Sequence, residues 1–248
     1  MNMQFAVTPM GFLICSAIAT ALASSFIPEA SLAGKSNGEQ MLAKADHIRN
    51  PSSSYRMRIG VKSEDDEREF DVFLKGTDKT LIVAKEPARM RGQNMLMLDR
   101  DFYAYVPNLK KSLRLSLSQK MMGLVANGDI ARTRWSGDYT VFVEKGDAKE
   151  TQMLLNGTKK NLTYQKIRLW LDTSTSRPLR AEYLSLNGKA VLKKAAFEEY
   201  KTLAGSQRPS RIRIEDAGGK QSTIVIQDME SSDLDESTFT LANLEKAK

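Results

Sequence analysis

The chain has 248 residues, with 37 lysines and arginines against 30 aspartates and glutamates, one histidine and one cysteine. This length predicts one main domain with a substantial core. One histidine and one cysteine exclude His/Cys metal clusters, disulfide frameworks and catalysis by a Cys–His pair. With 41% hydrophobic and 27% charged residues, the composition is that of a folded protein. We therefore expect no metal site and no cofactor.

An uncharged apolar run from Met10 to Ala23 comes first, and it is short for a membrane-spanning helix. The triplets Ala21-Leu22-Ala23 and Ser31-Leu32-Ala33 each have small residues at their first and last positions. This pattern is typical of signal-peptide cleavage sites. We therefore expect residues 1–33 to be a signal peptide, cleaved after Ala23 or Ala33, followed by a single domain over 34–248. An uncleaved anchor is the alternative. The net charge of +7 would suit a nucleic-acid partner, but an exported protein does not meet one. The remaining candidate partners for a basic protein are anionic lipid head groups and acidic proteins.

The domain is predicted to open with a short amphipathic helix over 38–48. Met41, Leu42, Ala45 and Ile48 follow helical spacing, and Asn37 is a candidate N-cap. The pair Asn50-Pro51 ends the pattern. The helix therefore has one apolar face to place against a sheet.

Short strands follow in close succession. Apolar residues alternate with charged ones in 55–62 and in 69–75, and the acidic run 64–67 between them predicts a turn. Further candidate strands are 80–84, 93–98, 102–106, 112–117, 139–144, 152–155, 164–171, 179–186, 190–200, 210–215 and 223–227. This many strands at near-regular spacing predict an antiparallel barrel or sandwich. Several of these runs are apolar at every position, so the side of each strand that faces inward stays open.

One segment departs from the strand pattern. Residues 118–126 (SQKMMGLVA) begin with a serine suited to an N-cap, continue with helix formers and end at Asn127-Gly128. We expect a helix here, with its apolar side chains spread over more than one face and Gly123 in its middle. Two interpretations stay open, a movable lid and a static core helix. No group of acid, base or nucleophile appears elsewhere, so an enzyme is not expected.

A family resemblance rests on an ordered run of features. Residues 86–98 (EPARMRGQNMLML) form a turn and a strand, 101–108 (DFYAYVPN) an aromatic strand ending in Pro-Asn, and a basic strand and the segment 118–126 follow. This order resembles the LolA-like outer-membrane lipoprotein-sorting family over residues 37–244. The resemblance implies a mainly β fold, an incomplete antiparallel barrel of about 11 strands with a helical lid. It also implies carriage of acylated proteins or lipids across the periplasm.

The function that the resemblance implies is a periplasmic carrier that takes acyl chains into an apolar half-barrel. The donor would be an inner-membrane transporter, membrane contact would be peripheral and transient, and the carrier would be a monomer. A non-enzymatic interaction module that assists a transporter without carrying lipid is the alternative. The expected acyl-chain cavity is lined by Leu74, Val83, Met95, Met97, Tyr103, Tyr105, Leu113, Leu115, Met121, Met122 and Leu124. The basic residues expected to contact a head group or partner are Arg89, Arg91, Lys110, Lys111 and Arg114.

Overall fold

The computed structural model describes Met1 and residues 36–246, apart from 52–53 and 132–133. Contacts divide the chain into 1–34 and 35–248, and the second unit holds the fold. The expected signal peptide and both cleavage positions lie outside the described residues. Among the helices that are described, none is both long enough and apolar enough to cross a membrane.

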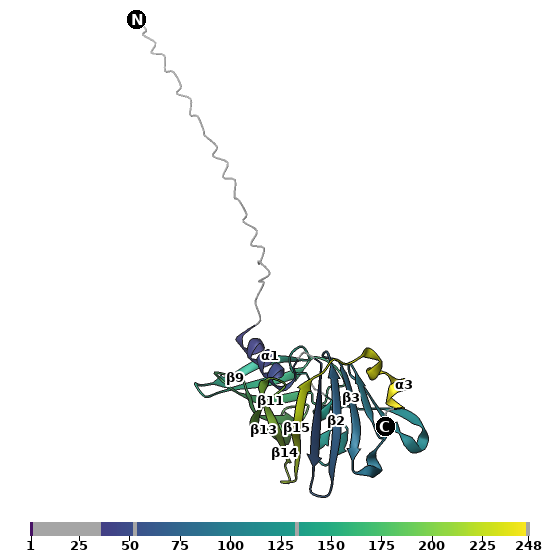
Figure 1. Ribbon diagram of the computed structural model, residues 1–248. Coiled ribbons are helices and arrows are strands. Elements are labelled where there is room, and N and C mark those ends of the chain that lie inside the picture. The colour runs from purple at the N-terminus through teal and green to yellow at the C-terminus, as the bar shows by residue number, and fades with distance from the viewer. Residues whose placement is uncertain (2–35, 52–53, 132–133, 247–248) are drawn as a thin grey trace. The chain divides into compact units, whose positions relative to one another are not determined.

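Thirteen antiparallel strands form one sheet, in the order β6-β5-β4-β3-β2-β1-β15-β14-β13-β12-β11-β10-β9. Their bounds are β1 Tyr55–Lys62, β2 Glu67–Lys75, β3 Lys79–Glu86, β4 Met95–Leu98, β5 Asp101–Val106, β6 Lys111–Leu115, β9 Tyr139–Gly146, β10 Glu150–Gly157, β11 Lys166–Asp172, β12 Pro178–Leu184, β13 Val191–Leu203, β14 Ser206–Asp216 and β15 Gln221–Ser231. The order ends at β6 and β9, so the barrel is open, as expected. The sheet is curved, so that β9 and β11 run at a steep angle to β2 and β3 (Figure 1).

The order of the strands explains how the chain crosses the sheet. Strands β1 to β6 form one meander and β9 to β15 another, and the two meet where β1 pairs with β15. Because β6 and β9 are opposite edges, the connection between them must travel the width of the sheet. We call its described residues, 116–131 and 134–138, the crossing segment. Its side chains at Leu117, Val125 and Trp135 are buried in the main core, on the concave face.

The helix predicted over 118–126 is wrong. The crossing segment forms a small hairpin, β7 (Lys120–Met122) and β8 (Val125–Ala126), followed by one helical turn, α2 (Asn127–Ile130). Gly123 has φ +52°, and a Cβ there would lie 2.5 Å from the Ser222 hydroxyl. The backbone N–H of Leu124 donates to the same hydroxyl at 3.0 Å. Tertiary contacts therefore satisfy the backbone and outweigh the local helix propensity.

Helix α1 (Asn37–Arg49) covers one part of the sheet, as the sequence predicts. Its N-cap is Ser36, one residue before the expected Asn37, and Ser36 and Glu39 form a capping box. At its other end, the buried Arg208 donates from Nη1 to the carbonyls of His47 and Ile48, at 2.8 and 2.6 Å. The helix is thus fixed to β14 by its last carbonyl groups.

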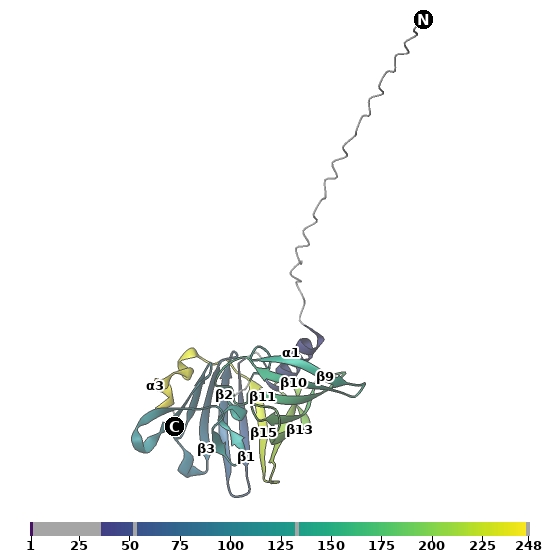
Figure 2. The same ribbon diagram turned by 180° about the vertical axis from the view of Figure 1, so that it is seen from behind.

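Part of the sheet is covered on both faces. The short helix η3 (Glu236–Phe239) contacts β3, and α3 (Leu241–Leu244) contacts β4. Helix α3 lies toward the C-terminus at the β3 side of the sheet (Figures 1 and 2). Phe239 and Leu244 pack there against Leu81, Val83 and Leu96, in a cluster separate from the main core. This second layer explains why residues 81–84 of β3 and all of β4 are apolar on both faces. Two further 3₁₀ turns are η1 (Ala88–Met90) and η2 (Pro107–Leu109).

A buried ion pair fixes the crossing segment to the far side of the sheet. Lys193 Nζ lies 2.9 Å from a carboxylate oxygen of Asp129 and donates to the Leu124 carbonyl at 2.7 Å. Both side chains are about one-tenth exposed, at 11% and 8%. Tyr164 donates its hydroxyl to Asp129 at 2.9 Å, and burial raises the pKa of Tyr164, which keeps it a neutral donor. The Lys193 ammonium also lies 4.8 Å from the centre of that ring.

Lys193→Met is expected to lower the free energy of unfolding by about 3 kcal/mol, because it leaves the Asp129 carboxylate buried without its cation. The matched control is Lys194→Met, which removes an exposed lysine from the next position of β13. The control is expected to change stability by less than about 0.5 kcal/mol. Urea unfolding of both variants measures the difference. Equal effects of the two substitutions would contradict the anchoring role of Lys193.

Candidate functional site

A cavity of about 530 Å³ opens at one end of the concave face. Its walls come from β2, β4, β5, β6, the loop between β3 and β4, and the hairpin strand β7. The apolar lining residues are Phe70, Met90, Met95, Ala104, Val106, Pro107, Leu115 and Met121. The polar ones are Arg68, Arg89, Arg91, Gln93, Tyr105, Asn108, Gln119, Lys120 and Asn127. Its volume falls within the range of about 300–1,000 Å³ found for small-ligand sites.

The loop between β3 and β4 is positioned by its own hydrogen bonds. Asn94 is fully buried, and its side-chain carbonyl accepts the N–H of Ala84 at 3.2 Å. Its backbone carbonyl accepts the N–H of Tyr105 at 2.9 Å. Arg91 Nε donates to the Lys85 carbonyl at 3.0 Å. These bonds fix the loop between β3 and β5 and place Met90 on the cavity wall.

The predicted cavity residues divide between the two faces of the sheet. Leu74, Met95, Met97, Leu115, Met121, Met122 and Leu124 belong to the main core on the concave face or pack against it. Val83, Tyr103 and Tyr105 belong to the cluster under η3 and α3 on the opposite face. Leu113 pairs with Ala104 across β5 and β6 and is exposed at the sheet edge. Met95, Leu115 and Met121 border the cavity, and so does Tyr105, although its side chain also packs against the cluster of the opposite face.

The predicted basic residues also divide into two groups. Arg89 and Arg91 border the cavity, whereas Lys110, Lys111 and Arg114 are exposed on the β5–β6 turn and on the edge strand β6. Arg114 forms an ion pair with Asp101. The sequence analysis missed Arg68 and Lys120, which also border the cavity. Arg68 is one of several charged residues that alternate along its strand, and Lys120 lies in the segment for which a helix was predicted. No local sequence pattern therefore identified either residue as part of a site.

Two carboxylates outside the cavity lining pair with its arginines. Asp66 pairs with Arg68 at 2.6 Å and with Arg89 at 3.4 Å, and Glu86 pairs with Arg91 at 2.5 Å. The hydrogen bond from Arg68 lowers the pKa of Asp66. The charge of Asp66 is therefore kept at neutral and mildly acidic pH, and its ion pairs weaken only as the pH falls through that lowered pKa.

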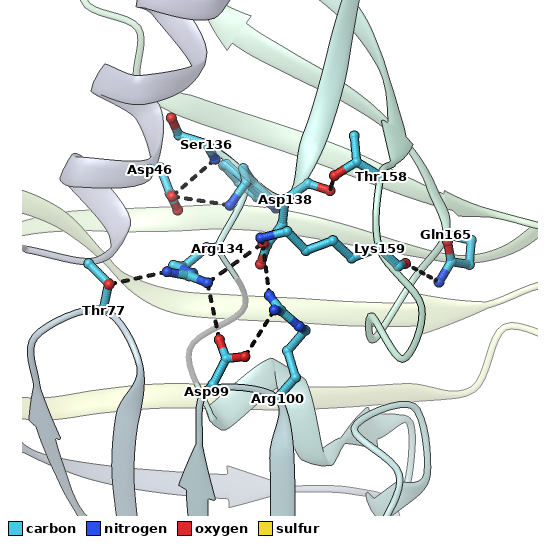
Figure 3. A network of polar contacts seen from close by, with 11 residues as sticks. Asp46, Thr77, Asp99, Arg100, Arg134, Ser136, Asp138, Thr158, Lys159 and Gln165 are labelled. Atoms are coloured by element: carbon cyan, nitrogen blue, oxygen red, sulfur yellow. Dashed lines mark hydrogen bonds and ion pairs between the residues drawn. The ribbon is translucent and has the colours of Figure 1, made fainter.

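A second polar cluster lies around Asp138 (Figure 3). The Asp138 side chain is 5% exposed and faces three cations, Lys159 at 2.8 Å, Arg100 at 3.4 Å and Arg134 at 3.6 Å. Asp99, which lies in the β4–β5 turn, forms ion pairs with both Arg100 and Arg134. The cluster connects that turn with the beginning of β9 and the end of β10. It joins the two flanks of the open sheet, which is a structural role.

A metal site is not formed by the side chains that the structure describes, since they contain no group of three His, Cys, Asp or Glu residues placed to hold an ion. The cavity instead offers an apolar floor and a basic rim. Nine of its seventeen lining residues are polar, and four of those nine are cations.

Comparison with solved structures gives the family. A LolA superfamily protein from Nitrosomonas europaea is 36% identical, with a TM-score of 0.76, and the match covers 84% of this chain and 99% of that one. The chain belongs to the LolA superfamily. Residues 76–246 also match a family model whose description reads "Uncharacterized protein". Among curated proteins nothing matches.

Two more distant structures share the fold. One is a domain assigned to outer membrane lipoprotein sorting from Vibrio parahaemolyticus, at 20% identity, TM-score 0.72 and coverage of 84% of this chain and 98% of that one. The other is a DUF1329 family protein from Desulfovibrio piger, at 20% identity and TM-score 0.72, covering 84% and 97%. The LolA-like fold, with its unclosed antiparallel sheet, is therefore confirmed for this member of the superfamily.

Asp138→Asn is expected to lower the free energy of unfolding by about 3 kcal/mol, because three clustered cations lose their buried counter-charge. Asp99→Asn is the control within the same cluster, since the Asp99 side chain is 54% exposed. We expect the control to cost less than about 1 kcal/mol. Thermal unfolding of both variants provides the measurement. If Asp99→Asn were the more damaging change, Asp138 would not be the centre of the cluster.

Proposed function

We propose that the protein is a periplasmic carrier that binds an acyl chain of a lipid or lipoprotein in the 530 Å³ cavity and moves it between the inner and outer membranes. The observation that carries the proposal is a cavity with an apolar floor and a basic rim, in a member of the LolA superfamily. Burying an acyl chain contributes about 0.8 kcal/mol per methylene group, which suffices for carriage without covalent attachment.

The methionines of the cavity suit a ligand that must be both taken up and released. Met90, Met95 and Met121 border it, and their unbranched side chains adapt to an irregular apolar chain. The hairpin that carries Met121 is part of the crossing segment, which Lys193 and Ser222 hold at other points. Loading therefore requires movement of side chains and of the cavity rim rather than release of the whole segment.

We assign the exposed basic edge to membrane head groups or to the donor transporter in the inner membrane. Lys110, Lys111 and Arg114 lie there, outside the cavity. Positive charge at an exposed edge attracts anionic lipid surfaces and acidic protein surfaces. In this assignment the contact is peripheral and transient, and the carrier acts as a monomer without an enzymatic step.

The test of the cavity uses Ala104→Trp, which places an indole ring in the space meant for the chain. Affinity for a fluorescent acyl probe is expected to fall by about tenfold or more, because the burial of several methylene groups is lost. The control is Leu113→Trp, whose parent side chain shares the same face but is exposed at the edge. Circular dichroism checks that both variants fold.

Unchanged affinity of Ala104→Trp would place the acyl chain elsewhere on the molecule. If the unmodified protein binds no acyl probe at all, the carrier proposal fails. A non-enzymatic module that assists a transporter would then be favoured.

We further propose that residues 1–33 direct export and are removed after Ala23 or Ala33. The apolar run without charges and its small-residue ends support this. Cell fractionation followed by N-terminal sequencing is expected to find a periplasmic chain that begins at Ser24 or Gly34. Recovery of only the full-length chain, in the inner membrane, would contradict it.

A further inference from the structure

We infer that the cargo is an amphiphile with one long acyl chain and an anionic head group, and that the head group lies against Lys120 and Arg89. The inference rests on the proposed function and narrows it. It follows from the volume of the cavity, from the change of its lining from apolar inside to charged at the opening, and from the net charge of its rim.

The volume sets the number of chains. Sites of about 300–1,000 Å³ bury most of one drug-sized ligand. The cavity, at about 530 Å³, lies in the middle of that range. One long acyl chain fills that space, whereas two or three long chains exceed it.

The lining gives the orientation of the chain. Phe70 and Met95 are 1% and 8% exposed and form the inner wall. The Arg89 side chain is 70% exposed and the Arg91 side chain 60%, so both stand at the opening. An apolar tail would therefore bind inside the cavity, and a polar head group would lie at the opening, where water can reach it.

The charges select the head group. Four cations border the cavity, and none of its lining residues carries a carboxylate. Asp66 and Glu86, which do not border the cavity, neutralise the three arginines only in part. Within the part of the chain that the structure describes, Lys120 makes no ion pair or hydrogen bond through its ammonium group. The rim therefore has an excess of positive charge, which a carboxylate or a phosphate would neutralise.

Arg89 is the arginine best placed to change partners. Its bond to Asp66 is long, at 3.4 Å, and Asp66 keeps the shorter bond to Arg68 when Arg89 turns away. An exposed ion pair of this kind contributes little to stability. Binding of a head group to Arg89 therefore costs little in lost protein contacts.

The experiment measures displacement of a neutral fluorescent acyl ester from the exported protein. The competitors share the same hexadecanoyl chain. They are the free fatty acid, lysophosphatidylglycerol, the zwitterionic lysophosphatidylcholine and the neutral monoacylglycerol. Two-chain phosphatidylglycerol and a triacylated lipopeptide complete the set. We expect the two single-chain anions to compete best, and the carboxylate and phosphate arms show which anion is preferred.

The test variant is the double substitution Lys120→Gln and Arg89→Gln. It is expected to weaken binding of the single-chain anions by about tenfold and to leave binding of the monoacylglycerol unchanged. Its matched control is Lys110→Gln with Lys111→Gln, which removes two basic residues that do not border the cavity. The control is expected to bind every competitor as the unmodified protein does.

Each outcome has a separate meaning. Equal competition by all single-chain lipids, with no effect of the double substitution, would overturn the head-group inference and leave the carrier function intact. Stronger competition by the two-chain lipid or the lipopeptide would overturn the single-chain inference alone. Absence of probe binding by any form of the protein would remove the proposed function itself.

Discussion

The position of β6 and β9 at opposite edges of one sheet is the constraint on which the rest of the structure depends. The connection between them has to cross the concave face, and its apolar side chains are part of the main core there. The interior is therefore packed beneath Trp135 and Val125. A cavity of about 530 Å³ remains at one end, beside the loop between β3 and β4, and a smaller one of about 50 Å³ lies against β1, β14 and β15. The same connection contributes side chains to the main core and forms one wall of the cavity.

Polar groups inside the half-barrel hold this connection in one place. Asp129 accepts hydrogen bonds from Lys193, from Tyr164 and from the N–H of Ala126. Asp138 forms ion pairs with three cations that come from both flanks of the sheet. Buried charges are costly to desolvate, and such pairs fix one arrangement when their partners are complete. We interpret these contacts as the means by which an open sheet keeps its curvature while one end stays accessible.

The sequence predicted the architecture well because alternation along antiparallel strands is a local signal. Residues 55–62 and 69–75 showed it clearly, and the feature order in 86–108 identified the superfamily. The inward side of β3, β4 and β5 could not be predicted, since η3 and α3 bury the second face from far along the chain. Val83, Tyr103 and Tyr105 were assigned to the concave face for that reason.

The crossing segment shows where local reasoning fails. Residues 118–126 have helix formers and a capping serine, but Ser222 and the edge-to-edge path impose a hairpin with a left-handed Gly123. Arg68 and Lys120 join Arg89 at the cavity only through the fold, because they come from β2 and β7. Contacts between residues so distant in sequence leave no periodic pattern to read.

A crystal structure of the exported protein with a bound long-chain acyl ligand tests the central claim most directly. The account predicts continuous density for the chain between Phe70, Met95, Leu115 and Met121, with its polar end toward Arg89. A chain bound on the opposite face of the sheet, or a cavity closed by its own side chains while the ligand lies elsewhere, would contradict it.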